Sequence, residues 1–442
     1  MDALSSFVLV SLTLVVLCMP RRWALLGMAA GVLYLTEYAA VDVAGFNMFA
    51  IRFLELAGFA RVMARREFRF SSLNDLDRIF IFFYCYLTIV YLLRANGGFA
   101  YAIGVAVDAG LCYFTFRGLV SDVDDLRWFL RAFVFLLAPY VLLLFVEMLT
   151  RHSPFWVIVG NAKADWLRKG RPRCVGSFRE PSLLGSLGAS FLPLYIGLYF
   201  SKSDRLYSIF GILLSIAIVG FSNSGGPLGF TCFVLLGWLV WPWRTKMRLV
   251  RRIILIFTIG LALVMKAPIW YLPTHFTFGG DAWHRSYLID ISMRHLREWW
   301  LWGMPVSKTA HWFAYTLGTM DQADITNQYL SYGFGAGLMA VVLFVWLLVR
   351  AFQNLGRQME LVRYNAYFTP ESEYLLWGLG AMLIGHIANF ISITYFDQFY
   401  VIWFMQLAFI SSLTQAPAYA PAQATELRLL RFTRWSVARF RL

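Results

Sequence analysis

The stretch FLRAFVFLLAPYVLLLFVEML at residues 129–149 decides the fold class. It is apolar over about the 20 residues that a helix needs to cross a bilayer. Similar runs occupy residues 227–243 and much of 325–349. Lipid offers backbone amides no hydrogen-bond partner, so each run must form a helix that satisfies its own amides. We therefore expect an all-α polytopic membrane protein.

The composition agrees with this class. Of the 442 residues, 60% are hydrophobic and 14% are charged, whereas a soluble chain is about half apolar and a quarter charged. In a soluble protein the net charge of +14 would suggest a nucleic-acid partner. No motif that reads RNA or DNA is present, so we expect no nucleic-acid partner. The five cysteines form no CxxC pair, which argues against a zinc site or a disulfide framework.

Hydropathy predicts about thirteen spans, within a range of about 12 to 14. The expected spans are 5–20, 23–41, 44–62, 78–94, 98–116, 129–149, 182–200, 206–222, 226–243, 252–268, 325–349, 373–392 and 396–413. We interpret the first as a retained span, because it lacks the basic start of a signal peptide. Lys and Arg gather in alternate loops, which would all be cytoplasmic if the N-terminus is outside.

These spans predict six segments. They are N-terminal transmembrane helices at 1–150, a basic external loop at 151–181, transmembrane helices at 182–268, a large external loop with an amphipathic helix at 269–324, C-terminal transmembrane helices at 325–413 and a basic cytoplasmic tail at 414–442. The tail mixes Arg with Leu, Phe and Trp. This favours an amphipathic helix on the anionic leaflet over a disordered tail.

The external loop at 151–181 is basic although the positive-inside rule disfavours Arg and Lys on that side. It carries Arg171, Arg173 and Arg179, followed by Glu180. One guanidinium group can bind two phosphate oxygens at once, and it stays charged at any working pH. The loop therefore favours an anionic, phosphorylated substrate at the outer leaflet. The alternative is a solvated loop that touches lipid headgroups.

Two further segments combine polar and apolar residues. Residues 283–300 predict an interfacial helix with Arg285 and Arg294, whose tryptophans suit the headgroup level or could stack on sugars. In residues 321–338, Asp324 and Asn327 precede a glycine-rich helix start. That pattern fits either a polar site or an N-cap with close helix packing.

Some polar residues fall inside predicted spans. Arg52 and Glu55 share a helix face and are expected to pair. His386 and Asn389 are functional candidates by their position, with structural pairing as the alternative. The six histidines are scattered and no HExxH, GxSxG or Walker A pattern occurs, so we expect no metal and no cofactor.

Together the three segments resemble the O-antigen polymerase and ligase superfamily, over residues 170 to 340. That family has an Arg-Gly-Phe-x-x-Pro-type segment, an Arg in a large external loop, and an Asn-x-x-Leu before a glycine-rich helix. The matching positions are Arg173, Gly176, Phe178 and Pro181; Arg285 or, in second place, Arg294; and Asn327, Leu330, Gly333 and Gly337. Ligases usually have His before the Asn. This chain has Thr326 there, with Asp324 as the nearest acid, which favours a polymerase.

The resemblance implies a GT-C-like, metal-independent membrane glycosyltransferase. Its substrate would be an undecaprenyl-pyrophosphate-linked oligosaccharide, joined into O-antigen, capsule or exopolysaccharide at the periplasmic face of a bacterial inner membrane. Partners would include the lipid bilayer and chain-length or export proteins. The open alternatives are an O-antigen ligase acting on lipid A core, a transporter or flippase of lipid-linked sugars, and a passive scaffold.

Roles for individual residues follow from this resemblance together with charge. The catalytic candidates are Arg285, Asp324 and Glu180. Pyrophosphate binding is expected from Arg171, Arg173, Arg179 and Arg294, and acceptor positioning from Asn327 and His311.

Overall fold

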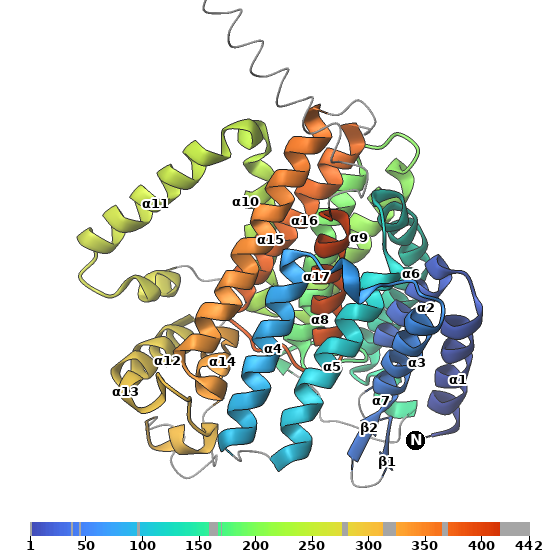
Figure 1. Ribbon diagram of the computed structural model, residues 1–442, viewed down its shortest axis with the longest axis horizontal. Coiled ribbons are helices and arrows are strands. Elements are labelled where there is room, and N and C mark those ends of the chain that lie inside the picture. The colour runs from blue at the N-terminus through green and yellow to red at the C-terminus, as the bar shows by residue number, and fades with distance from the viewer. Residues whose placement is uncertain are drawn as a thin grey trace, which may run out of the picture.

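The computed structural model describes residues 2–36, 39–43, 46–94, 98–158, 167–168, 170–275, 282–312, 324–364 and 370–415. Over these residues the chain is all-α apart from two small hairpins (Figure 1). The predicted amphipathic tail lies outside the described residues.

Six helices among the described residues are long and apolar enough to cross a membrane. They are α4 (Asp75–Arg94), α5 (Gly98–Leu119), α6 (Val123–Thr150), α8 (Pro181–Leu198), α9 (Arg205–Ser222) and α15 (Leu338–Tyr364). Helices that match the other predicted spans are α1 (Ala3–Cys18), α2 (Arg21–Tyr34), α3 (Ala50–Ala64), α10 (Gly225–Leu239), α11 (Met247–Val264), α16 (Pro370–Asn389) and α17 (Phe399–Leu413). The prediction of an all-α membrane protein is confirmed at this level.

Two predicted spans have the wrong ends. The span expected at 23–41 ends at Tyr34, and the chain then forms a hairpin of β1 (Ala40–Val43) and β2 (Phe46–Phe49) before α3 begins. The β-branched residues Val41 and Val43 favour this extended backbone.

The second correction concerns the span expected at 325–349. A short helix, α14 (Gln328–Ala336), comes first, and α15 starts only after a break at Gly337. Gly337 has φ +81°, where glycine meets no steric penalty. A Cβ there would lie 2.3 Å from the carbonyl oxygen of Leu301. The bare backbone lets residues 300–301 contact the start of α15, and the amide of Leu338 donates to the carbonyl of Trp300 at 2.7 Å.

The core of the bundle is built on α8 and α17, which are buried along almost their whole length. Small residues let neighbouring backbones approach α8 closely. A Cβ on Gly188 would lie 2.5 Å from the carbonyl oxygen of Ser215 in α9, and one on Gly378 in α16 would lie 2.7 Å from that of Pro193. As a result α9, α10 and α16 all pack on α8.

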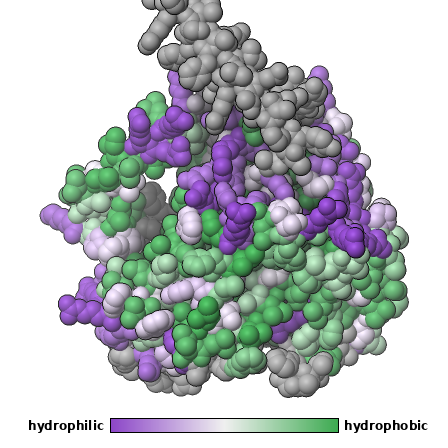
Figure 2. Space-filling view, in the orientation of Figure 1, coloured by the Kyte–Doolittle hydropathy of each residue, from purple (hydrophilic) through white to green (hydrophobic). Residues whose placement is uncertain are grey.

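The ends of the bundle differ in charge. At the upper end in Figure 1, which we call the basic end, ion pairs tie the helix termini together. Arg127 pairs with Asp204 (3.3 Å) and Glu371 (2.7 Å), and Arg244 pairs with Glu373 (3.3 Å). Figure 2 shows hydrophilic side chains gathered toward this end, above a broad apolar band. The opposite end, the loop end, carries β1–β2, α7 (Pro154–Ile158), α12 (Ala282–Arg294), α13 (Leu296–Trp299) and α14 (Figure 1).

Candidate functional site

The turn before α8 is held by a buried carboxylate. Glu147, near the end of α6, accepts hydrogen bonds from the amides of Val175 (2.7 Å) and Gly176 (2.9 Å). The carbonyl of Gly176 accepts in turn from Trp156 Nε1 at 3.0 Å. Gly176 has φ +57°, and a Cβ there would lie 2.4 Å from the hydroxyl of Tyr140. This turn fixes the chain between the two predicted phosphate ligands, Arg173 and Arg179.

Arg173 reaches the start of α10. Its Nη2 donates to Ser224 Oγ at 2.8 Å, and Ser224 is the N-cap residue of α10. The amide of Cys174 bonds to the carbonyl of Phe221 at 3.0 Å, which fastens the loop to the end of α9. First-turn amides of a helix have no intrahelical partner and carry the positive end of its dipole. Arg173 therefore adds a fixed cation to an end that already favours anions.

Arg285, on α12, approaches the same helix end from a segment distant in sequence. Its Nη2 lies 3.9 Å from the point where a Cβ on Gly226 would stand. Ser392 Oγ and Asn389 Oδ1 lie 3.2 and 3.5 Å from that point. Gly226 follows the N-cap by two residues, so Arg173 and Arg285 flank one turn of α10. Two loops that are distant in sequence thus bring guanidinium groups to one helix N-terminus.

Arg179 lies at the loop end but is partly neutralised. Its Nη1 is 3.4 Å from Asp397 Oδ1, and its guanidinium lies 5.8 Å from the ring centre of Phe396. The Asp397 side chain is 3% exposed, whereas that of Arg179 is 44% exposed. Arg179 therefore links the loop before α8 to the α16–α17 connection, residues 390–398, and keeps an exposed face.

The other predicted cations are less central. Arg294 pairs with Asp290 at 2.8 Å and its side chain is 72% exposed. It stands about 13 Å from Arg285 along α12, at a rise of about 1.5 Å per residue. Arg171, on β4 (Arg171–Pro172), is exposed. The structure gives neither residue a contact with the first turn of α10.

The predicted acids and acceptor ligands have varied surroundings. Glu180 is the N-cap residue of α8 and is half-buried, while Asp324 is exposed just before α14. Asn327 is buried; its Oδ1 caps the amide of Leu330 (3.0 Å) and its Nδ2 donates to the carbonyl of Ile391 (3.4 Å). These bonds make Asn327 a support for residues 390–398, and an acceptor contact stays a prediction. The side chain of His311, in 3₁₀ helix η4 (Val306–Trp312), lies outside what the structure describes.

Two parts of the site escaped the sequence prediction. One is the Ser224-Gly-Gly-Pro227 start of α10, whose Ser N-cap and first-turn Pro are recognised signals of a helix start. The other is residues 390–398, which contribute Ser392, Tyr395 and Asp397. His386 and Asn389 were flagged by sequence, and both lie beside this segment.

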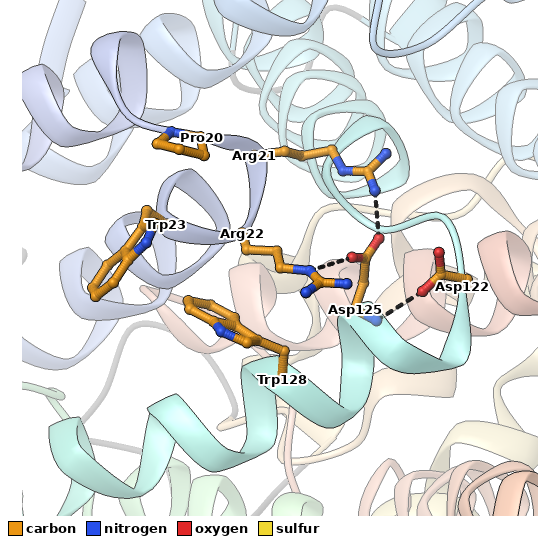
Figure 3. Close-up of a pocket in the computed structure, with 7 residues that line it drawn as sticks. All are labelled: Pro20, Arg21, Arg22, Trp23, Asp122, Asp125 and Trp128. Carbon is orange, nitrogen blue, oxygen red and sulfur yellow. Dashed lines mark hydrogen bonds and ion pairs between the residues drawn. The ribbon is translucent and has the colours of Figure 1, made fainter.

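A pocket of about 370 Å³ lies at the basic end, away from these residues (Figure 3). The rise of about 1.5 Å per residue puts Asp125, in this pocket, about 33 Å from Glu147 along α6. Asp125 accepts from Arg21 at 2.6 Å and from Arg22 at 2.7 Å, and Trp23 meets Trp128 edge to face. The pocket is lined by Pro20, Arg21, Arg22, Trp23, Asp122, Asp125 and Trp128. Its basic groups are already paired, so we place the candidate site at the loop end.

The candidate site therefore contains Arg173 and Arg285 at the first turn of α10 and Arg179 on the 390–398 segment. Such a site can bind a phosphate or pyrophosphate through charge-assisted hydrogen bonds. In the described part of the chain, no three His, Cys, Asp or Glu side chains are placed to hold a metal ion. A metal-free mechanism stays a prediction.

Comparison of the sequence with models of known families and with curated proteins finds no match, and comparison of the fold with solved structures finds none either.

Proposed function

We propose that the chain is a membrane glycosyltransferase that joins undecaprenyl-pyrophosphate-linked oligosaccharides. Its site would face the periplasm of a bacterial inner membrane. The observation that carries the proposal is the meeting of Arg173 and Arg285 at the first turn of α10. This arrangement provides two fixed cations and a helix dipole for one anionic group, at the end of the bundle where a lipid headgroup would lie.

The proposed reaction needs charge stabilisation more than a strong nucleophile. An acceptor hydroxyl oxygen attacks the anomeric carbon of the donor sugar, and the bond from that carbon to the pyrophosphate oxygen breaks. The pyrophosphate leaves with the electron pair. Arg173, Arg285 and the α10 amides would stabilise the charge that develops on it, as fixed donors in a dry site do. The hydroxyl proton would pass to a carboxylate, for which Asp324 and Glu180 are the candidates.

A polymerase fits better than a ligase on the residues before α14. The resembling ligases have a His directly before the Asn, where this chain has Thr326, with the exposed Asp324 two residues earlier. The growing glycan would then pass to the non-reducing end of an incoming lipid-linked unit. A ligase that transfers glycan to lipid A core stays the alternative within the same chemistry.

A transporter of lipid-linked sugars needs a polar path that crosses the bilayer. Buried polar residues extend inward from Asn389 to Gln406 and Ser190, but all three are buried and bonded to protein groups. Over the residues that the structure describes, this chain of side chains offers no open route for a hydrated glycan. This observation favours an enzyme that acts at one face.

The test uses purified protein in proteoliposomes with the lipid-linked oligosaccharide of its own host. Wild type should convert it to a ladder of lipid-linked products. Arg285→Ala and Arg173→Ala should each lower the rate by about 10²- to 10³-fold, as expected for the loss of a charge-stabilising donor. Arg297→Ala, an exposed arginine of the same loop, is the matched control and should retain the rate.

Other outcomes would redirect the proposal. A single transfer to lipid A core, with no ladder, would identify a ligase. Movement of intact substrate across the liposome bilayer without any transfer would identify a transporter. Full activity of both Arg173→Ala and Arg285→Ala would show that chemistry occurs elsewhere.

A further inference from the structure

A line of buried hydrogen bonds runs from the membrane interior to the candidate site. Gln406 donates through Nε2 to Ser190 Oγ (3.0 Å) and contacts His386 Nε2 through Oε1 (2.6 Å). His386 Nδ1 contacts the hydroxyl of Tyr395 at 2.7 Å. Tyr395 contacts Asn389 Nδ2 at 3.0 Å. These buried polar side chains are all hydrogen-bonded to one another, yet the proposed reaction assigns them no role.

The direction of each hydrogen bond in this line is fixed from its buried end. Ser190 donates its own proton to the carbonyl of Leu187 at 2.9 Å, so it can only accept from Gln406. The amide oxygen of Gln406 must then face His386, and His386 Nε2 must carry the ring proton. His386 Nδ1 is left as an acceptor, so Tyr395 donates to it. Burial raises the pKa of Tyr395 well above its usual value, which keeps this proton in place.

The same argument orients Asn389. Its Nδ2 meets two oxygens whose protons are already used: Tyr395 Oη, and Ser186 Oγ at 2.9 Å, which itself donates to the carbonyl of Ser182. Both neighbours can only accept from this nitrogen. Amide nitrogen and oxygen cannot be told apart by shape, but these partners assign them. Asn389 Oδ1 therefore faces the other way, toward Gly226 and Ser392.

Ser392 is the end of the line and is partly exposed. Its hydroxyl has two partners on Asn389, Oδ1 at 3.2 Å and the backbone oxygen at 3.1 Å. Both are acceptors, so the serine proton points back into the protein. With Asn389 turned the other way, Nδ2 would donate to Ser392 Oγ and occupy one of its lone pairs, so the orientation of Asn389 decides what Ser392 presents. In the orientation assigned above, the lone pairs of Ser392 Oγ are turned toward the site. An oxygen presented in this way accepts from a hydroxyl but repels the oxygens of a phosphate, which are acceptors themselves.

We propose that Ser392 binds a hydroxyl of the acceptor sugar, and that Asn389, Tyr395, His386 and Gln406 are positioning residues that hold its lone pairs outward. The inference rests on the proposed function and divides the site in two. Arg173, Arg285 and the start of α10 take the phosphate side of the donor. Ser392, beside Gly226, takes the sugar.

The kinetic test needs a substrate that can serve only as acceptor. An alkyl glycoside of the repeat unit lacks pyrophosphate, so its KM can be measured at a saturating concentration of lipid-linked donor. Ser392→Ala removes one hydrogen-bond acceptor and should raise this KM about 2- to 12-fold, the range expected for one neutral hydrogen bond. The Kd for undecaprenyl pyrophosphate should stay unchanged. Ser392→Thr keeps the hydroxyl and should restore the KM.

Tyr395→Phe tests the positioning line. It should raise the KM for the glycoside by a similar factor with little change in kcat. The matched control is Tyr329→Phe, because Tyr329 also donates to α16, to the carbonyl of Ile387 at 3.2 Å, but lies outside the line. A merely structural role would give both variants the same loss of stability and the same KM. Equal KM values in all these variants would overturn the inference.

A spectroscopic measurement tests the line without any turnover. Solid-state ¹⁵N spectra of histidine-labelled protein in liposomes, with His386→Gln to assign the signal, should show a neutral ring with the proton on Nε2. A proton on Nδ1, or on both nitrogens, would reverse the bond directions and overturn the inference. If wild type shows this tautomer and binds the glycoside but transfers no sugar, the proposed function fails while the line stands. If it transfers sugar and Ser392→Ala keeps the KM, only the inference fails.

Discussion

Replacement of Glu147 by Gln should loosen the turn that holds Arg173. In the native turn the two carboxylate oxygens accept one backbone amide each, from Val175 and Gly176. A carboxamide has the same shape but offers only one oxygen, so one amide would face an NH₂ group. A buried donor without a partner costs about 1–3 kcal/mol, and a hydrogen bond to a charged group contributes about 1.5–3 kcal/mol against about 1 for a neutral one.

These two terms together lower the free energy of opening the turn by about 1.5–5 kcal/mol. At about 1.36 kcal/mol for each factor of ten, the amides of Val175 and Gly176 should exchange with solvent about 10- to 5,000-fold faster. Hydrogen–deuterium exchange of peptides covering residues 170–180 measures this rate. Transfer activity should fall as well, because Arg173 sits two residues before Val175.

The matched control is Glu55→Gln. Glu55 is also a buried glutamate on a helix, but one of its oxygens accepts from Tyr400 at 3.0 Å and the other has no hydrogen-bond partner. This substitution leaves no backbone amide of residues 170–180 without its acceptor, so exchange there should stay at the wild-type rate. Unchanged exchange in Glu147→Gln would refute the view that the carboxylate holds the turn. Equal acceleration in both variants would show general loosening of the bundle.

Three further predictions follow from the geometry. Gly337→Ala should lower the thermal unfolding temperature in detergent. A side chain in that backbone region costs about 1–3 kcal/mol, and its Cβ would meet the carbonyl of Leu301. The control is Gly356→Ala, in open space on α15, which should leave the unfolding temperature equal or higher. Cys174 is 2% exposed, and burial raises the pKa of its thiol to about 12. Maleimide should therefore label Cys174 slowly in folded wild type and faster in Glu147→Gln, and peptide mass spectrometry measures the labelling. Gly226→Leu should abolish sugar transfer, because its side chain would reach the space between Arg285, Asn389 and Ser392, whereas Gly226→Ala, whose methyl would lie 3.2 Å or more from its neighbours, should keep most of the activity.

Sequence alone placed the helices well because long apolar runs mark helices both in the core of the bundle and on its outside. Each of the thirteen expected spans has a helix within the described residues. Span ends were missed where a single residue decides them. Gly337 breaks the helix that the apolar run predicts, since residues 300–301 pack on its bare backbone. Hydropathy carries no information about that contact.

The candidate site was predictable only in its charged residues. Arg173 stood out in a basic loop that was predicted on the outer side, against the usual topology, and Arg285 stood out through the resemblance to the polymerase and ligase superfamily. Their meeting point did not, because a contact between distant loops depends on how α8, α9 and α10 pack. Tyr395 and Gln406 are single polar residues in apolar surroundings, and only the packed neighbours tell which partner each one takes.

The position of Gly226 explains why one site can treat two chemical groups differently. A Cβ at this position would lie within 4 Å of Arg285, Asn389 and Ser392 at once. An anion is drawn to the guanidinium and repelled by the oriented oxygen of Ser392, while a hydroxyl can donate to that oxygen without competing for the arginines. A donor pyrophosphate and an acceptor hydroxyl would thus be bound by different groups at one helix start before any catalytic base acts.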